Sequence, residues 1–345
     1  MAKRLVVCCD GTWNTPDQSS DGKQCPTNVT KVARAVARED AAGAAQVLYY
    51  HRGVGSNRGE RLRGGAFGFG LSRDVLRAYR FIVESYEPGD QLYFFGFSRG
   101  AFTARSTVGL VRNAGILRPQ HAGLVDEAYA LYRDAATAPR SIESELFRRS
   151  YSHETRIRFV GVWDTVGALG IPMSGMRWVN LINRRWQFHN VDLSTTVDAA
   201  FQALAIDERR RPFEPTLWSQ QPDAGEQRLE QVWFTGVHCD VGGGYPNSGL
   251  SDLALRWMVE RARSCGLEFE QDAFAATRPD LLGELHESRK AFYRLQRPFV
   301  RPIGQRKQGH ELVGSAALER QKMDSEYAPA GLMKYLQGPH DVTEV

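Results

Sequence analysis

Residues 90–111 read DQLYFFGFSRGAFTARSTVGLV, and this stretch decides the fold class. An apolar and aromatic run typical of a buried strand is broken by Gly96-Phe97-Ser98-Arg99-Gly100, and a helical pattern follows at once. A Gly-x-Ser-x-Gly turn between a strand and a helix projects its serine from the carboxyl edge of a sheet. The stretch therefore predicts Ser98 as a nucleophile, the alternative being a tight turn without chemistry.

Other short apolar runs along the chain also end in loops rich in glycine or acidic residues. Three of them are strong runs like the one before Ser98: RLVVCCDGTWN (4–14), RIRFVGVWDTVG (156–167) and QVWFTGVHCDVGGGY (231–245). A weaker run is QVLYYH (46–51). Helical periodicity falls between them, at 28–42, 72–86, 99–114 and 251–264, with Asn28, Ser72 and Ser251 as expected caps. Alternating strands and helices predict an α/β fold, a doubly wound and mainly parallel sheet like that of α/β hydrolases.

Length and composition indicate one domain with insertions. The chain has 345 residues, of which 42% are hydrophobic, enough for a sizeable core. We expect a single domain with these parts: core 4–265, an irregular glycine-rich loop at 53–71, helical or loop insertions at 115–155 and 170–228 forming a cap, and a polar C-terminal extension at 270–345.

The charge and cysteine content exclude several classes of protein. A net charge of +4, spread along the chain without a basic tail, does not favour nucleic acid as a partner. Five cysteines without a CxxC pair indicate reduced thiols and no zinc finger. The N-terminal apolar run is too short for a signal peptide, and no run is long enough for a transmembrane helix. We expect a cytoplasmic protein, or one exported by a signal-independent secretion system.

A serine nucleophile needs a general base and an acid that orients it, and two later strand ends supply these residue types. GVWDTVG places Asp164 after a strand, and FTGVHCD places His238 after another. The order serine, acid, histidine is that of α/β hydrolases. Asp207, in LAIDERRRPF, competes with Asp164 for the acid role, and Asp240 ranks third.

The oxyanion of an acyl-transfer intermediate needs backbone donors. The amide of Arg99, directly after the nucleophile, would be the first. If the strand order is 2-1-3-4-5, the loop after the first strand lies beside the serine, so Gly11 or Thr12 would offer the second while Asp10 braces the turn.

Other chemistries fit less well. VVCCDGTW is similar to the aspartate motif of haloacid-dehalogenase phosphatases, but Cys8 stands where the nucleophile would be. No P-loop ending or cysteine-phosphatase spacing is present. A metal site built from Asp10, Asp164, His238 and Asp240 is an alternative that would leave the serine turn unexplained. A triad mechanism requires no cofactor and no metal.

Five ordered motifs carry a resemblance to a known family: CCDGTWN, AYRFIVESYEPGDQLYFFGFSRGAFTAR, GVWDTVGALG, ALAIDERRRPFEPTLW and WFTGVHCDVGGGY. Together they resemble the α/β-hydrolase catalytic domain of type VI secretion phospholipase effectors, a former domain of unknown function, from about residue 4 to 258. The resemblance implies an ester hydrolase, with phospholipids as the substrate of better-known members. It puts Ser98, Asp164 and His238 in the triad and favours Asp164 over Asp207.

These observations together predict a serine hydrolase that cleaves a carboxylic ester, of a lipid or phospholipid, through an acyl-enzyme. One alternative is a soluble non-lipid esterase or thioesterase of the same fold, and another is a catalytically inactive binding module. A transient contact with a membrane surface would use exposed aromatic residues such as Trp178, Trp186 and Phe188, which otherwise form the core of a helical cap.

Overall fold

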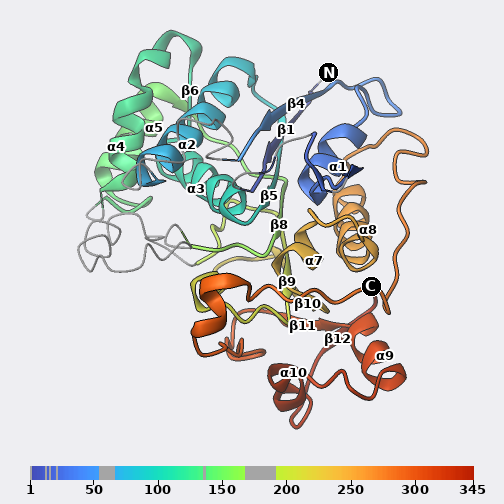
Figure 1. Ribbon diagram of the computed structural model, residues 1–345. Coiled ribbons are helices and arrows are strands. Elements are labelled where there is room, and N and C mark those ends of the chain that lie inside the picture. The colour runs from blue at the N-terminus through green and yellow to red at the C-terminus, as the bar shows by residue number, and fades with distance from the viewer. Residues whose placement is uncertain are drawn as a thin grey trace.

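A computed structural model describes residues 2–11, 14, 17–20, 22–53, 67–134, 137–167 and 192–345 of the chain. Most of the expected glycine-rich loop, Thr12, and the aromatic residues Trp178, Trp186 and Phe188 lie outside the described residues. Elements carry the labels of Figure 1.

The described strands form one large parallel sheet and two small antiparallel pairs (Figure 1). In chain order, the large sheet contains β1 (Arg4–Cys9), β4 (Gln46–His51), β5 (Gln91–Phe97), β8 (Phe159–Trp163), β9 (Ala199–Ala205), β10 (Arg228–Phe234), β11 (Glu311–Gly314) and β12 (Val342–Thr343). The small pairs are β2 (Ser19–Ser20) with β3 (Lys23–Gln24), and β6 (Ile116–Leu117) with β7 (Ser152–His153).

Helices cover both faces of this sheet. They are α1 (Asn28–Ala35), α2 (Phe67–Ser85), α3 (Arg99–Ala114), α4 (Val125–Arg133), α5 (Ile142–Tyr151), α7 (His238–Gly242), α8 (Gly249–Ser264), α9 (Ser315–Met323) and α10 (Ala330–Tyr335), with short 3-10 turns η1 (Pro119–Leu124), η3 (Arg211–Phe213) and η4 (Ala291–Leu295). None of the helices in these described ranges is both long and apolar enough to cross a bilayer.

The first strand shows how sequence alternation creates two layers. Leu5 and Val7 point into the core formed with α2 and α3, whereas Val6 and Cys8 point into the core formed with α1 and α8. Successive side chains of a strand point to opposite faces, so a continuous apolar run fits only a sheet covered on both sides. In Figure 1, α2 and α3 lie on one side of the strands, and α1 and α8 lie on the other.

The strand order confirms the predicted α/β fold with a doubly wound, parallel sheet. The order is β12-β11-β10-β9-β8-β5-β1-β4. Counted from β4, the second strand of the sheet in the chain comes before the first, and the other strands follow in chain order, which is the expected 2-1-3-4-5 arrangement. All neighbouring pairs are parallel. The carboxyl ends of β1, β5, β8 and β10 therefore meet at one edge, which is where ligands bind in such sheets.

Several sequence expectations differ from the structure. The expected insertion 170–228 contains a central strand, β9, and the expected polar extension after 270 contributes β11 and β12. The first helix ends at Ala35, and its cap is Thr27 rather than Asn28, because the Thr27 hydroxyl accepts the amide proton of Thr30. The helices expected at 72–86 and 251–264 begin earlier, at Phe67 and Gly249.

The close packing of α3 on β1 generates a prediction about Gly100. A Cβ there would lie 2.1 Å from the carbonyl oxygen of Cys9 and 2.4 Å from that of Asp10, both backbone atoms. Gly100→Ala should lower the free energy of unfolding by about 1–3 kcal/mol or more, as overpacked cores do. Urea denaturation followed by fluorescence measures this change.

Gly123→Ala is the matched control, because no atom lies within 4 Å of a Cβ built at Gly123. If Gly100→Ala were as stable as Gly123→Ala, the described contact between α3 and the end of β1 would be wrong.

Candidate active site

Ser98 lies at the sharp turn between β5 and α3. Its backbone has φ 57° and ψ −121°, an unusual conformation for a residue other than glycine. The amide of Ser98 donates a hydrogen bond to the carbonyl oxygen of Trp163, 3.0 Å away, which continues the ladder between β5 and β8. The strained residue is thus fixed at the carboxyl edge of the sheet, as expected of a nucleophile elbow.

The glycines of the motif allow this turn. A Cβ on Gly96 would lie 2.6 Å from the Cα of Ala101, and Gly100 packs equally closely on β1. Opposite them, Gly242 of α7 lies against the ring of Phe97, which a Cβ would approach to 2.0 Å. Small residues on both sides bring α7, which carries His238, close to the serine turn.

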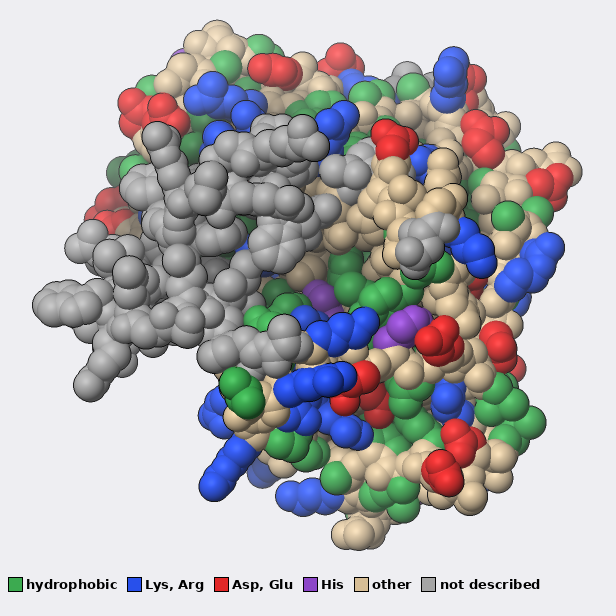
Figure 2. Space-filling model, viewed as in Figure 1, with side chains coloured by type: hydrophobic (Ala, Val, Ile, Leu, Met, Phe, Trp, Pro, Cys, Tyr) green, Lys and Arg blue, Asp and Glu red, His purple; other side chains and the backbone are tan. Residues whose placement is uncertain are grey.

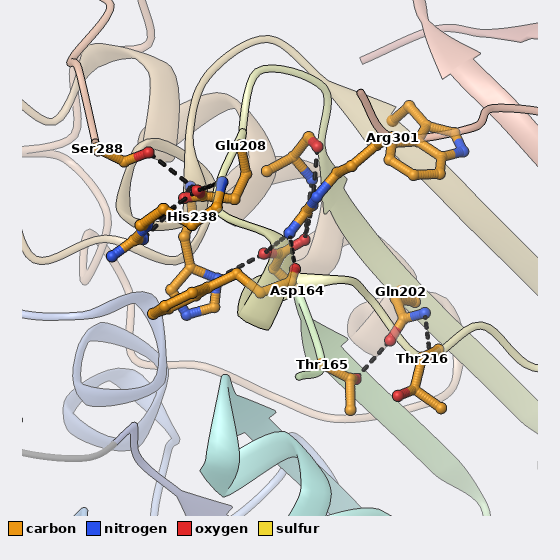
Figure 3. Close-up of polar contacts among 12 residues, drawn as sticks. Asp164, Thr165, Gln202, Glu208, Thr216, His238, Ser288 and Arg301 are labelled. Carbon is orange, nitrogen blue, oxygen red and sulfur yellow. Dashed lines mark hydrogen bonds and ion pairs between the residues drawn. The ribbon is translucent and has the colours of Figure 1, made fainter. Parts of the chain in front are cut away.

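Asp164 and His238 form a buried pair at the next strand ends. Oδ2 of Asp164 lies 2.5 Å from Nδ1 of His238, and both side chains are almost completely buried (Figure 3). Asp164 follows β8 directly and also has a positive φ, 40°. The His238 ring packs against those of Phe97 and Phe213, with centroids 4.7 and 5.0 Å away.

The other ring nitrogen of His238 is available for proton transfer. Nε2 is buried and has no hydrogen-bond partner within the part of the chain that the structure describes. The hydrogen bond to the serine hydroxyl that a working triad makes is therefore not formed in this state. Such catalytic hydrogen bonds are often long in ligand-free enzymes and tighten only when substrate binds.

Arg301 holds the carboxylate of Asp164 from the opposite side. Its Nη1 donates to Oδ1 at 2.6 Å and its Nη2 to Oδ2 at 3.0 Å, a bidentate ion pair that is fully buried (Figure 3). The same guanidinium donates to the carbonyl oxygens of Ala205 and Phe213. Arg301 lies in the expected polar extension, and nothing in the sequence distinguishes it from the many arginines around it.

The two partners of Asp164 determine the ionisation of the pair. Burial alone would raise the pKa of Asp164, but the charge of Arg301 and the hydrogen bond from His238 outweigh it, so this pKa is well below its ordinary value. Burial lowers the pKa of His238 below its ordinary value, and the opposing effect of Asp164 is smaller. His238 is accordingly neutral at pH 7, the state that a general base requires.

The two other acids considered from the sequence lie elsewhere. Asp207 accepts hydrogen bonds from the amide of Gly236 and the hydroxyl of Tyr327, at 2.7 and 3.0 Å. Asp240 lies 2.6 Å from Nδ1 of a different histidine, His286. Both carboxylates thus support the loop and helix that carry His238, without reaching its ring.

Glu208 is a buried acid that the sequence analysis did not select. It accepts a hydrogen bond from the backbone amide of His238 at 3.3 Å, another from the hydroxyl of Ser288 at 2.9 Å, and it pairs with Arg210 (Figure 3). Its position next to Asp207, just after a strand end, was the available signal. Glu208 connects the start of α7 to the C-terminal segment.

Two of the three residues expected to donate to the oxyanion, Arg99 and Gly11, are among the described residues. Arg99 is the first residue of α3, where amides point out of the helix N-terminus toward the edge that carries the serine. Gly11 lies beside Ser98, since a Cβ built on it would be 3.4 Å from the serine Cβ. The amide of Gly11, however, donates to Oδ1 of Asp10 at 2.7 Å. The other expected donor, Thr12, is not among the described residues.

Asp10 braces the loop after β1, as expected from the sequence. Besides Gly11, it accepts hydrogen bonds from the hydroxyls of Thr27, Thr30 and Tyr50, at 2.7 to 2.9 Å. Burial raises the pKa of Asp10, although these hydrogen bonds stabilise its charged form.

The residues of the alternative metal site have separate partners. Asp10 binds hydroxyls, Asp164 pairs with His238 and Arg301, and Asp240 pairs with His286. No group of three histidine, cysteine, aspartate or glutamate residues in the described ranges is arranged to hold a metal ion.

Comparisons with known proteins identify a family that matches most of the chain. The model of the family described as "T6SS, Phospholipase effector Tle1-like, catalytic domain" matches residues 3–261. An uncharacterized protein of Saccharomyces cerevisiae is 27% identical over 244 residues, 64% of this chain and 33% of the relative. The chain thus spans about a third of that relative's length.

Three solved structures resemble the chain at low sequence identity. An uncharacterized protein from Pseudomonas aeruginosa has a TM-score of 0.46 at 20% identity, covering 81% of this chain and 48% of its own. A butyrate-bound esterase from Thermogutta terrifontis has a TM-score of 0.39 at 14% identity, over 77% of this chain and 84% of its own. A putative carboxylesterase from Lactobacillus plantarum has a TM-score of 0.34 at 14% identity, over 76% and 86%.

The family match, in contrast, covers residues 3–261, which is most of the chain. The chain therefore belongs to the family of Tle1-like catalytic domains of type VI secretion phospholipase effectors.

Proposed function

We propose that this chain is a serine hydrolase that cleaves the carboxylic ester of a lipid or phospholipid through an acyl-enzyme. The observation that carries the proposal is the buried Asp164–His238 pair, whose ring packs against Phe97, the residue before the strained Ser98. Nε2 of this histidine has no hydrogen-bond partner among the described residues. Membership of a phospholipase effector family supports the ester and lipid parts of the proposal.

In this mechanism Ser98 Oγ attacks the ester carbonyl while Nε2 of His238 takes the hydroxyl proton. Asp164 accepts the Nδ1 proton of the ring, which fixes the tautomer and stabilises the imidazolium that forms. The negative oxygen of the tetrahedral intermediate is stabilised by the amide of Arg99 at the N-terminus of α3. The proton then returns from His238 to the departing alcohol, and water hydrolyses the acyl-enzyme by the same steps.

Arg301 acts in this scheme as a positioning residue. Its two hydrogen bonds to Asp164 orient the carboxylate so that Oδ2 faces the histidine. Its positive charge keeps Asp164 ionised and moderates the negative potential at the ring.

Replacement of the nucleophile tests the proposal. Ser98→Ala should lower kcat for hydrolysis of p-nitrophenyl esters and phospholipids by about 10³-fold or more, because Ser98 is the group that forms the acyl-enzyme in this mechanism. A panel of short-chain and long-chain esters, thioesters and phospholipids also identifies the preferred substrate.

Ser251→Ala is the control for this replacement, because Ser251 is a buried serine of α8 whose hydroxyl donates to the carbonyl oxygen of Ser248, away from the proposed triad. Full activity in Ser98→Ala would refute the mechanism.

The role of Arg301 predicts a change in pH dependence. The wild-type kcat/KM should rise with pH through an apparent pKa below the ordinary histidine value, because burial lowers the pKa of His238. In Arg301→Gln the lost positive charge leaves the imidazolium better stabilised. The acidic limb should therefore move to higher pH, and kcat should fall by about 10²-fold from misplacement of the carboxylate.

Arg301→Lys keeps the positive charge but loses the bidentate geometry. The acidic limb of its pH profile should therefore lie at the wild-type pH, while kcat should be only partly restored. Arg148→Gln is the control for loss of a structural arginine, because Arg148 binds carbonyl oxygens of Asn113 and Pro139. An Arg301→Gln enzyme with an unchanged acidic limb would show that Arg301 serves stability alone.

A further inference from the structure

Two neighbouring segments form one border of the active site. Residues 208–214 contain η3, and residues 287–300 contain η4; together we call them the basic rim. The ring of Phe213 lies 5.0 Å from that of His238 and 6.5 Å from that of Tyr293 in η4. The amide of Phe299 donates to the carbonyl oxygen of Arg209 at 2.8 Å, which joins the two segments.

The basic rim presents apolar side chains to solvent. Leu295, at the end of η4, is 85% exposed, the highest exposure of any large hydrophobic residue in the described ranges, and Val300 is 53% exposed. Single exposed apolar residues are common on protein surfaces. These two lie within one short segment that contacts the border of the catalytic site, which distinguishes them from scattered examples.

The basic rim also carries the net positive charge of the chain. It holds seven arginine and lysine residues against three glutamates, a net charge of +4, equal to that of all 345 residues. One of the glutamates, Glu208, is buried and paired with Arg210. The exposed cations are Arg209, Arg211, Lys290, Arg294 and Arg297. Figure 2 shows lysine and arginine side chains gathered over this part of the surface.

We propose that the basic rim docks the protein on a lipid surface that carries anionic head groups. Exposed leucine and valine would enter the boundary between head groups and acyl chains, while the surrounding arginines and lysine bind the negative head groups. Charge complementarity favours this partner, because apolar side chains flanked by cations match an anionic bilayer surface.

This docking surface rests on the proposed function, and it specifies the kind of lipid surface from which the substrate would come. Because Tyr293 and Phe213 connect η4 to His238, a membrane bound at the basic rim would face the mouth of the catalytic site. An ester bond just below the head groups would then have a short path to Ser98. The chain would select substrate by the surface on which it docks as well as by its catalytic residues.

Vesicle flotation tests the docking without lipid turnover when all variants are made in the Ser98→Ala background. The parent should bind vesicles of phosphatidylcholine mixed with phosphatidylglycerol, bind phosphatidylcholine alone much less, and dissociate at high salt. Leu295→Ser should weaken binding by about tenfold through loss of apolar insertion. Arg294→Gln combined with Arg297→Gln should weaken it by about tenfold or more.

Matched controls are available on other surfaces. Ile142→Ser removes a 72% exposed apolar residue from α5, and Arg256→Gln removes an exposed cation from α8; neither should change vesicle binding. Equal binding to neutral and anionic vesicles, no binding at all, or rim variants that bind like the controls would overturn the proposal.

Activity with the nucleophile intact separates this proposal from the previous one. Rim variants should hydrolyse a soluble p-nitrophenyl butyrate within about twofold of wild type but lose hydrolysis of anionic vesicles. Equal loss on both substrates would contradict docking. If vesicle binding followed the expected pattern while Ser98→Ala retained full hydrolysis, the catalytic mechanism would fail and the docking surface would stand.

Discussion

The buried ion pair between Arg301 and Asp164 is the constraint on which the site depends. An uncompensated carboxylate at the end of β8 would cost several kcal/mol, so Asp164 can be fully buried only with a cation and further hydrogen bonds around it. Arg301 supplies two of these bonds, and the amide of Ala205 and the ring of His238 supply the others. The pair therefore fixes β8, β9, α7 and the C-terminal segment around one carboxylate.

This arrangement makes the chain after the family match part of the proposed catalytic site. The match ends at residue 261, yet Arg301 holds the proposed catalytic acid, and Ser288 binds the glutamate that accepts the amide of His238. The same C-terminal segment contributes η4 to the border of the site and β11 to the sheet. The basic rim and the ion pair thus depend on one folded segment.

Much of the fold, and the positions of Ser98, Asp164 and His238 after strand ends, could be predicted because they follow local rules. Strong apolar runs gave the strands before Ser98, Asp164 and His238, and catalytic groups of parallel sheets gather at strand ends. β9 was missed because AAFQALA is rich in small residues and holds Gln202, a polar residue that is satisfied only by tertiary hydrogen bonds to partners such as Thr165. Arg301 was missed for a similar reason, since a distant ion pair leaves no periodic or spacing signal in sequence.

The central claim is that Ser98 is an activated nucleophile. The most direct measurement is reaction of the purified protein with a fluorophosphonate at pH 7, followed by peptide mass spectrometry. The account predicts one covalent adduct on the peptide that contains Gly96-Phe97-Ser98-Arg99-Gly100, at the Ser98 oxygen, and a much slower reaction after His238→Ala. No adduct, or an adduct on another residue at the same rate in both proteins, would contradict it.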